Sequence, residues 1–415
     1  MSTFSNEEKV QILSDIVAIE TVNDNEVEVC NYLQQLFSNY GIESKIQKID
    51  ERRANLIAEI GEGNPVIGIS GHMDVVSAGN KSQWTYDPFS LTEDDGFLYG
   101  RGAADMKSGL AALAIALIDI KQSQALQQGR IRFLATSGEE MEQLGSQTLY
   151  EHGYMDDVDA LLIAEPCQDI MVYAHKGSMD YRITSYGKSA HSSMPVMGIN
   201  AIKPLISFIQ DIDDAYARIS KEVQGKALDF TKFIDRIKPS LPATTALEDV
   251  ESALQGLVIS NTLIKGGVQV NSVPEEADAD FNIRTIPEYD NAQVKALFSN
   301  TIKSHNDKGA NLSSNLYLDL DPVLTTGDNS LINTAQSIAK SLFDKDFIAS
   351  PIGGVTDASN LLKNKDENFP FLVFGPGIKP HQIDECVEKD MYLKFIDFYS
   401  CLLYTSDAAD DLLCV

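Results

Sequence analysis

The stretch that decides the fold is Val66-Ile67-Gly68-Ile69-Ser70-Gly71-His72-Met73-Asp74. It begins as a short apolar run rich in β-branched residues, which is typical of a buried strand, and it ends in a glycine, a histidine and an aspartate. Open α/β sheets place their chemistry outside the carboxyl ends of such strands. The stretch therefore predicts an internal strand with functional side chains at its end.

The same order of apolar run and polar end recurs further along the chain. Residues 130–135 are followed by Ser137-Gly138-Glu139-Glu140, and residues 160–164 by Glu165-Pro166. Further strands are expected at 42–49 and 55–60, and helices at 6–20, 25–40 and 107–120. This alternation of strands and helices predicts a doubly wound α/β domain.

The pattern changes between residues 177 and 323. Strands are expected at 179–186, 257–265, 277–285 and 315–320, and helices at 199–219 and 292–304. The resulting βαββαβ order is ferredoxin-like and predicts a second domain inserted into the first. Residues 220–249 contain prolines and mixed charge, and we expect an insertion or a long loop there.

The α/β pattern returns after residue 323, with a helix expected at 329–343, a strand at 371–374 and a helix at 387–399. We therefore divide the chain into a catalytic domain in two parts, 1–176 and 324–400, and an inserted lid or dimerisation domain, 177–323. Residues 401–415 contain no Lys or Arg and hold two of the five cysteines. We interpret them as an atypical tail that is not native to the protein.

The composition excludes several classes of protein. The chain has 415 residues, enough for two or three domains, and its formal net charge of −28 would repel nucleic acid. Five cysteines without a CxxC pair disfavour a disulfide framework and favour the cytoplasm. No run of about 18 apolar residues suggests a membrane span, and the N-terminus lacks the basic and apolar segments of a signal peptide.

Motifs for other chemistries fail on spacing. A phosphate-binding loop ending at Gly187-Lys188-Ser189 would need a glycine where Arg182 stands. Gly61-Glu62-Gly63 lacks the third glycine of a dinucleotide fingerprint. The sequence contains neither a Gly-x-Ser-x-Gly nucleophile elbow nor an HExxH zinc motif.

Histidine and acidic residues at the strand ends form the pattern that remains. His72 and Asp74 project on the same side of an extended segment. Asp74 could therefore accept one imidazole N–H while the other ring nitrogen binds a metal. Glu139 and Glu140 are adjacent and would point apart, so they suit one general base and one metal ligand better than two ligands of one ion.

These segments resemble the metallopeptidase family of acetylornithine deacetylase, succinyl-diaminopimelate desuccinylase, aminoacylase and carboxypeptidase G. The resemblance covers about residues 6–400 and rests on several ordered motifs. The motifs are Ser70–Val76, Gly100–Gly109, Ser137–Glu140, Glu165-Pro166, Gly187–Ser193 and Gly353–Ala358. The implied fold is a doubly wound mixed-sheet metallopeptidase domain with an inserted ferredoxin-like (βαββαβ) lid or dimerisation domain.

The resemblance implies a site for two divalent metal ions per subunit, Zn²⁺ in the first place and Co²⁺ as the alternative. The ligands would be His72 and Glu165 for one ion, Glu140 and His381 for the other, and Asp105 bridging both. Glu139 would be the general base and Asp74 would orient His72. The peptide bond after Asp105 would be cis. Two divalent ions carry four positive charges, which three carboxylates and a bridging hydroxide would balance.

The same resemblance assigns residues to the substrate. His191, carried by the inserted domain, would stabilise the oxyanion in the active site of the other subunit of a homodimer. Arg284 would grip a substrate carboxylate. The further binding candidates are Asn271, Lys176, Gly354 and Thr356.

The implied activity is removal of the acyl group from an N-acyl amino acid. The family member that looks closest acts on N-succinyl-LL-2,6-diaminopimelate, in lysine and diaminopimelate biosynthesis. Acetylornithine deacetylase, aminoacylase and dipeptidase activities stay open, as does a non-catalytic binding role on the same scaffold. The expected partner is a small-molecule substrate rather than nucleic acid or a membrane. We expect His152, His175 and His305 to be structural, and Cys167 to be a small core residue.

Overall fold

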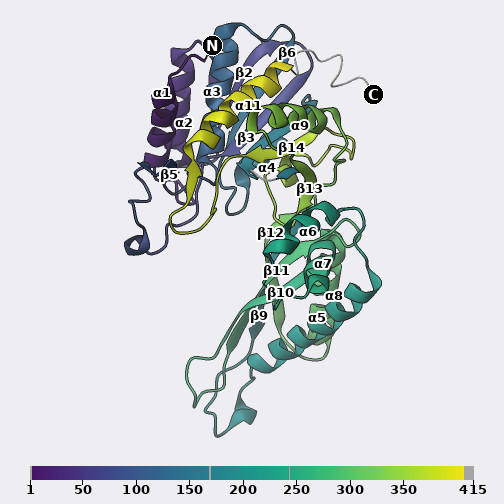
Figure 1. Ribbon diagram of the computed structural model, residues 1–415. Coiled ribbons are helices and arrows are strands. Elements are labelled where there is room, and N and C mark those ends of the chain that lie inside the picture. Colours follow the sequence, from purple (N-terminus) through teal and green to yellow (C-terminus); the bar gives the residue numbers. More distant parts are fainter. Residues whose placement is uncertain (1, 168–169, 243, 406–415) are drawn as a thin grey trace. The chain divides into compact units, whose positions relative to one another are not determined.

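The computed structural model describes residues 2–167, 170–242 and 244–405. Contacts between residues divide the chain into two compact units. The first unit comprises 1–173, 325–350 and 360–415, and the second comprises 174–324 and 351–359. Each unit has its own sheet and its own hydrophobic core (Figure 1).

An eight-stranded mixed sheet forms the frame of the first unit, in the order β1-β2-β6-β3-β7-β14-β8-β13. Its strands are β1 (Ser44–Lys48), β2 (Ala54–Glu62), β3 (Val66–His72), β6 (Gly129–Thr136), β7 (Ala160–Pro166), β8 (Ile170–His175), β13 (Ile348–Ile352) and β14 (Phe371–Gly375). The four strands β6, β3, β7 and β14 run parallel, and all residues of β3 are buried. Their carboxyl ends therefore meet at one edge of the sheet, where the chemistry of such sheets is placed.

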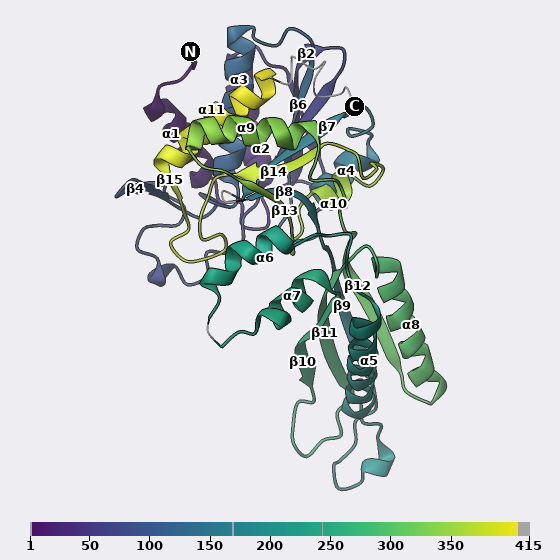
Figure 2. The same ribbon diagram turned by 45° about the vertical axis from the view of Figure 1, so that its right-hand side comes forward.

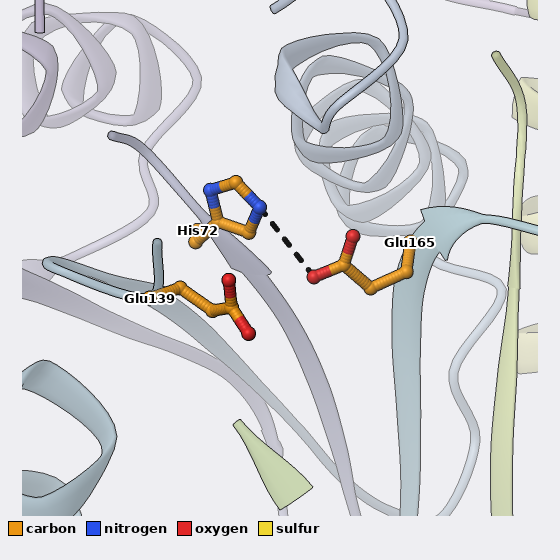
Figure 3. Close-up of side chains that lie close together, drawn as sticks. All are labelled: His72, Glu139 and Glu165. Atoms are coloured by element: carbon orange, nitrogen blue, oxygen red, sulfur yellow. Dashed lines mark ion pairs between the residues drawn. The ribbon is translucent and has the colours of Figure 1, made fainter. Parts of the chain in front are cut away.

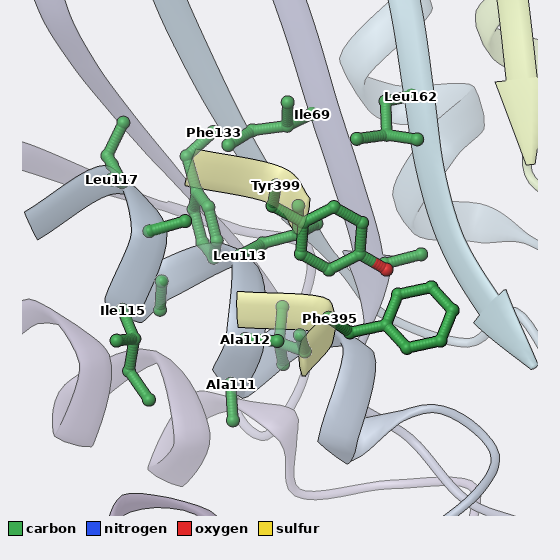
Figure 4. Close-up of a cluster of buried hydrophobic side chains, with 14 of the residues drawn as sticks. Ile69, Ala111, Ala112, Leu113, Ile115, Leu117, Phe133, Leu162, Phe395 and Tyr399 are labelled. Atoms are coloured by element: carbon green, nitrogen blue, oxygen red, sulfur yellow. The ribbon is translucent and has the colours of Figure 1, made fainter. Parts of the chain in front are cut away.

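Helix α3 (Lys107–Ser123) lies at the centre of the first unit. It packs against strands β3, β6 and β7 and against helices α1 (Asn6–Ala18) and α11 (Lys389–Thr405). Figure 4 shows Leu113 of α3 among Ile69, Phe133 and Leu162 of the sheet and Phe395 and Tyr399 of α11. Burying one such side chain contributes roughly 1.5–3 kcal/mol, so this core holds the loop before α3 against the sheet.

Smaller elements complete the first unit. They are α2 (Glu26–Asn39), η1 (Lys81–Gln83), α4 (Leu144–Glu151), α9 (Ser330–Phe343) and α10 (Ala358–Leu361), whose first two residues belong to the second unit. A separate three-stranded sheet has the order β15-β5-β4 and consists of β4 (Thr92–Asp94), β5 (Phe97–Tyr99) and β15 (Cys386–Glu388). No helix of the described residues is long and apolar enough to cross a membrane.

The second unit is a four-stranded antiparallel sheet in the order β10-β11-β9-β12. The strands are β9 (Gly177–Tyr186), β10 (Val258–Gly266), β11 (Glu276–Thr285) and β12 (Leu312–Leu320). Helices α5 (Ile202–Glu222) and α8 (Asn291–Asp307) pack on this sheet (Figure 2). Phe208 of α5, Phe281 of β11 and Phe298 of α8 meet in its core. The βαββαβ order and the predicted fold class are confirmed.

Of the two alternatives expected between residues 220 and 249, an insertion or a long loop, the structure excludes the loop. Instead of a loop, this part of the chain contains α6 (Thr231–Ile237) and η3 (Lys238–Ser240), and α7 (Leu247–Gln255) begins within it. A short 3-10 helix, η2 (Pro195–Met197), was not expected either. These elements could not be recognised in the sequence, because a helix of two turns shows little periodicity and prolines and short apolar runs interrupt the pattern.

Two segments lie differently from the expected domain boundaries. Residues 351–359 pack with the second unit, where the carbonyl of Ile352 accepts a hydrogen bond from the amide of Lys176 at 3.2 Å. Helix α11 continues to Thr405, and Leu402 and Leu403 are buried in the first core. The first residues of the expected tail are therefore part of the packed helix, and residues 406–415 lie outside the described residues.

Candidate metal centre

Five side chains converge at the carboxyl edge of the parallel strands. They come from the end of β3, the loop before α3, the loop after β6, the end of β7 and the loop after β14, and are His72, Asp105, Glu140, Glu165 and His381. Parallel strands bring their ends together whatever the distance between them along the chain. The first unit alone therefore assembles the complete predicted ligand set.

Asp105 lies between the two histidines. Its Oδ1 is 3.0 Å from Nε2 of His72, and its Oδ2 is 3.3 Å from Nε2 of His381. Nε2 of His72 also lies 3.5 Å from Oε1 of Glu165, and Nε2 of His381 lies 2.9 Å from Oε1 of Glu140. The cluster thus has two halves, each with one imidazole and one terminal carboxylate, which share the carboxylate of Asp105.

The carboxylate of Glu139 points towards the same space as His72 and Glu165. Figure 3 shows the three side chains around one opening, with the ion pair between His72 and Glu165 drawn. One ligand atom of each lies within 4.8 Å of those of the other two. Glu139 and its neighbour Glu140 contribute to different groups of ligand atoms in this cluster.

Asp74 is placed beside His72, but through a different atom from the one predicted. Nδ1 of His72 is 2.9 Å from the main-chain carbonyl of Asp74, whereas the Asp74 carboxylate is 3.7 Å away. That carboxylate instead accepts the amides of Glu139 and Glu140, each at 3.0 Å. The carboxylate turns away from the imidazole because two main-chain N–H donors at the turn after β6 stabilise it more than one imidazole N–H would. Asp74 therefore orients the loop of Glu139 and Glu140 with its carboxylate and orients His72 with its carbonyl.

The carboxylates of the site stabilise positive charge, and the pKa values of its side chains show this effect. Burial opposes the charged form of His72, yet Glu165, Asp105 and Asp74 outweigh it and raise the pKa of His72 well above its ordinary value. The hydrogen bonds of Asp105 and Glu140 raise the pKa of His381 to about 10. Burial and the nearby Asp105 raise the pKa of Glu165 well above its ordinary value. Both imidazoles therefore lie among carboxylates that stabilise a positive charge at this position.

The donor set fits two divalent ions. Imidazole nitrogens and carboxylate oxygens are the ligands that zinc and related ions take in catalytic sites. Two groups of the described residues bring donors within 4.8 Å of one another, His72 with Glu139 and Glu165, and His72 with Asp105 and Glu140. The peptide bond between Asp105 and Met106 is cis. With His381 beside the second oxygen of Asp105, these donors would suffice to hold two ions.

A close approach of helix and strand positions Asp105 near Glu165. A Cβ on Gly109 of α3 would stand 2.1 Å from the carbonyl oxygen of Ala164 in β7. Only glycine lets the two backbones approach so closely. The first turn of α3, and the loop before it, consequently lie directly beside the end of β7.

Sequence reasoning missed two residues that support the site. Nε2 of Gln143 donates to Oε1 of Glu139 at 2.9 Å, and Gln143 is fully buried. Glu385, also fully buried, accepts the amides of the loop that carries Asp105. No periodicity distinguishes Gln143 in the sequence. An acidic residue directly before the apolar Cys386-Val387 was the available signal for Glu385.

The second unit holds the six residues predicted to bind substrate or the oxyanion. Four of them lie near the start of β9, where Arg284 of β11 is paired with Ser178. Burial lowers the pKa of Lys176 to about 8 with Arg284 adding to the effect, and it lowers the pKa of Arg284 as well. Thr356 is buried with its hydroxyl 3.2 Å from Nε2 of His175, and Gly354 is exposed. No acidic side chain among the described residues forms an ion pair with Arg284.

The ammonium group of Lys176 is already hydrogen-bonded to main-chain carbonyls, which the sequence did not predict. Its ammonium donates to the carbonyl of Ala253 at 2.9 Å and to the carbonyl of Gly256, at the C-terminal end of α7. Helix C-termini attract cations through their free carbonyls. A substrate carboxylate would have to displace these carbonyls, so Arg284 is the better placed of the two cations.

His191 and Asn271 lie together beyond the other end of β9. The amide of Ser192 donates to the carbonyl of Asn271 at 3.0 Å, and His191 forms a β-bridge with Ser272. Nδ1 of the exposed His191 is 2.7 Å from the hydroxyl of Ser193. The structure therefore brings His191 and Asn271 together, and separates both from Arg284 by the length of the strand.

Comparisons with known proteins identify relatives in sequence and in fold. The sequence profile of the Peptidase family M20/M25/M40 matches residues 68–405. A Staphylococcus aureus protein named probable succinyl-diaminopimelate desuccinylase is 47% identical over 402 residues, covering 96% of this chain and 97% of that protein. A Staphylococcus epidermidis protein of the same name is also 47% identical and covers 96% of this chain and 98% of its own. The structure of an M20 family metallo-carboxypeptidase from Sulfolobus solfataricus shares the fold, with a TM-score of 0.78 at 19% identity over 97% of this chain and 99% of that one.

Proposed function

The chain belongs to the Peptidase family M20/M25/M40, and on that premise we propose that it hydrolyses N-succinyl-LL-2,6-diaminopimelate to succinate and LL-2,6-diaminopimelate. The observation that carries the chemistry is the carboxylate of Asp105 between His72 and His381. The observation that carries the substrate is 47% identity, over nearly the whole chain, to a protein named for this reaction. The proposed role lies in diaminopimelate and lysine biosynthesis in the cytoplasm.

We propose two divalent ions as cofactors, Zn²⁺ in the first place and Co²⁺ as an alternative. His72 and Glu165 would hold one ion, Glu140 and His381 the other, and Asp105 both. When bound, such a pair supplies Lewis acidity that lowers the pKa of a water molecule and polarises an amide carbonyl. The mixed nitrogen and oxygen donors favour zinc over the harder magnesium and calcium ions.

Glu139 is the proposed general base. Its carboxylate faces the space beside His72 and Glu165, where the attacking water would lie. Glu139 takes the proton of that water as the water attacks the amide carbonyl, and it then delivers the proton to the leaving amine. The hydrogen bond from Gln143 holds Oε1 of Glu139 in place.

Arg284 is the proposed recognition group for a substrate carboxylate. Its guanidinium is half-buried, and burial lowers its pKa, so an anionic partner would regain the electrostatic energy that burial costs. The proposed substrate carries a succinyl carboxylate and two amino-acid carboxylates. A planar guanidinium binds such a group with two parallel hydrogen bonds.

We further propose that His191 acts in the active site of a second copy. Arg284 lies near the start of β9 and His191 beyond its end, and the ten residues of this strand span about 30 Å. One copy of the second unit therefore cannot present both groups to one small substrate. Large apolar side chains close to His191 are exposed, namely Val196, Ile199, Val268 and Val270. Such a cluster is typical of a protein–protein interface, and a homodimer through this unit would cover it.

A substrate panel tests the proposed function. The purified protein is freed of metal, loaded with Zn²⁺ or Co²⁺, and incubated with N-succinyl-LL-2,6-diaminopimelate, N-acetylornithine, an N-acetyl amino acid and a dipeptide. Release of succinate with the highest kcat/KM is the expected result. Faster cleavage of another substrate would assign that activity to the protein instead. Two bound ions without any turnover would favour a binding protein.

A further inference from the structure

The loop that carries Asp105 is fastened to a buried carboxylate. Oε1 of Glu385 accepts main-chain N–H groups from Gly102 at 3.0 Å, Ala104 at 2.9 Å and Asp105 at 2.8 Å. The main-chain carbonyl of Glu385 accepts a fourth, from Gly100 at 3.0 Å. Hydrogen bonds to an ionised acceptor are stronger and more directional than those between neutral groups. Three N–H groups on one carboxylate oxygen, and a fourth on the main-chain carbonyl of the same residue, define the course of the backbone up to Asp105.

Arg101 completes the charge balance of this cluster. Its guanidinium forms an ion pair with Oε2 of Glu385, donates to the carbonyl of Ser77 at 3.2 Å and lies 5.1 Å from the ring centre of Trp84. The side chains of both Glu385 and Arg101 are almost completely buried. A buried carboxylate held by an ion pair and by three main-chain N–H groups is a rigid element, because any displacement leaves a charge or an amide unpaired.

Glu385 also belongs to the loop that carries His381. The loop is closed by hydrogen bonds between Ile378 and Cys386, and it is unusually bent, since Lys379, His381 and Asp384 have positive φ angles. Non-glycine residues adopt this conformation only where the surroundings impose it. The side chain of Glu385 is the anchor of this loop on its neighbour, four residues after the predicted ligand.

We propose that Glu385 is a positioning residue of the metal centre, which holds the loops of Asp105 and His381 in the spacing that lets Asp105 bridge two ions. The inference rests on the proposed metal centre and goes beyond it, because Glu385 is not one of the proposed ligands. It acts on Asp105 through hydrogen bonds to the backbone of that loop, and on His381 because both residues belong to the same bent loop. The half of the site formed by Asp105, Glu140 and His381 depends on it most, since His72 and Glu165 are held by the strands.

The test compares metal binding by three forms of the full chain. Apo forms of the wild type, Glu385→Gln and Glu388→Gln are titrated with Zn²⁺ by calorimetry in the absence of substrate. Glu388→Gln is the matched control, because Glu388 is an exposed acid three residues further along β15. Loss of an outer partner of a metal ligand typically costs 10–100-fold in affinity. We expect Glu385→Gln to lose 10–100-fold in affinity for one of two ions, and the control to bind both as the wild type does.

The outcomes separate positioning from general stability. Circular dichroism and thermal melting establish that each titrated form is folded, and Glu385→Asp, which keeps the charge, should recover part of the affinity. A folded Glu385→Gln variant with wild-type affinity for both ions overturns the proposal, even if its melting temperature falls. If Glu385→Gln does not fold, Arg101→Lys takes its place with the same criterion. A wild type that binds two ions but releases no succinate would refute the proposed function alone.

Discussion

The imidazoles of His72 and His381 contact opposite oxygens of one carboxylate. Nε2 of His72 lies 3.0 Å from Oδ1 of Asp105, and Nε2 of His381 lies 3.3 Å from Oδ2. In the proposed metal centre this carboxylate would bridge two ions, with one ion position beside each imidazole. The two positions differ in exposure, since His72 is 1% exposed and His381 is 51% exposed at the side chain. Substitutions at His72 and at His381 therefore test the two proposed ion positions separately.

Replacing His381 should remove one ion and leave the other. In His381→Ala the position formed with Glu140 loses its only imidazole, whereas His72, Glu165 and Asp105 remain. We expect elemental analysis of dialysed protein to fall from two zinc ions per chain to one. The matched control is His152→Ala, which removes an exposed imidazole bound only to the carbonyl of Thr148 in the same unit. Two ions in the His381 variant would exclude this residue as a ligand.

Replacing Glu139 should stop turnover without emptying the site. Glu139→Gln keeps the size and one oxygen of the side chain but cannot accept a proton, so kcat should fall at least 100-fold. The metal content should stay at the wild-type value. Glu142→Gln, an exposed acid three residues further on, is the control and should keep wild-type kcat. Substantial activity in Glu139→Gln would show that another group is the base.

Gln143 should affect kcat and leave KM unchanged. Its hydrogen bond holds Oε1 of Glu139 at 2.9 Å, so Gln143→Met frees the base to adopt unproductive rotamers. Misplacement of a catalytic group lowers the rate between roughly 10- and 100-fold. KM should stay constant because the lost contact is with the base and not with the substrate.

A nearly identical pair provides the control for Gln143. Gln147 donates to Oε1 of Glu151 at 2.8 Å, one helical turn further along and away from the metal cluster. Gln147→Met should leave both kinetic constants at their wild-type values. Equal decreases in kcat for the two variants would mean that a change in helix α4, and not the orientation of Glu139, lowers the rate.

The second unit should lose stability as the pH falls because of His175. Burial lowers the pKa of His175 to about 4, from an ordinary value of 6.5. The unfolded chain then binds the proton more readily than the folded one, so stability is complete above pH 6.5 and is lost as the pH falls towards 4. At pH 5 the loss relative to pH 7.5 amounts to about 2 kcal/mol.

Urea unfolding at these two pH values measures the effect. The wild type is compared with His175→Asn, which cannot take up a proton, and with His152→Asn as the matched exposed control. The pH-dependent change in unfolding free energy should be smaller by about 2 kcal/mol in His175→Asn than in the other two forms. Identical pH dependence in all three would mean that His175 is protonated in the folded protein.

Complementation between two inactive variants tests whether His191 serves a second copy. Glu139→Gln and His191→Ala chains are mixed under conditions of subunit exchange. In a mixed dimer, the chain with intact Glu139 receives His191 from the other chain. Random exchange should restore about a quarter of the wild-type activity, because half of the dimers are mixed and each has one complete site. No recovery despite demonstrated exchange would place His191 in its own chain's site or outside it.

Much of the site could be predicted from the sequence because strand ends are local features. The runs that end at His72 and Glu165 show apolar residues in strand length with polar residues directly after them. Parallel strands of one sheet share an edge, so the convergence of these side chains follows from the fold class alone. Whether these two residues, with Asp105, Glu140 and His381, act as ligands stays a prediction for the experiments above.

Only the tertiary structure decided which atoms support those side chains. Glu385 meets the amide of Asp105 across 280 positions, and the carboxylate of Asp74 takes the amides of Glu139 and Glu140 instead of the imidazole of His72. Periodicity records which residues face the core, and it therefore predicted the sheet and the inserted βαββαβ unit, whereas the candidate ligands came from the resemblance to a known family. The partner of a buried polar group depends on how distant loops pack and on which unpaired donors remain there, and this is settled only when the whole chain is folded.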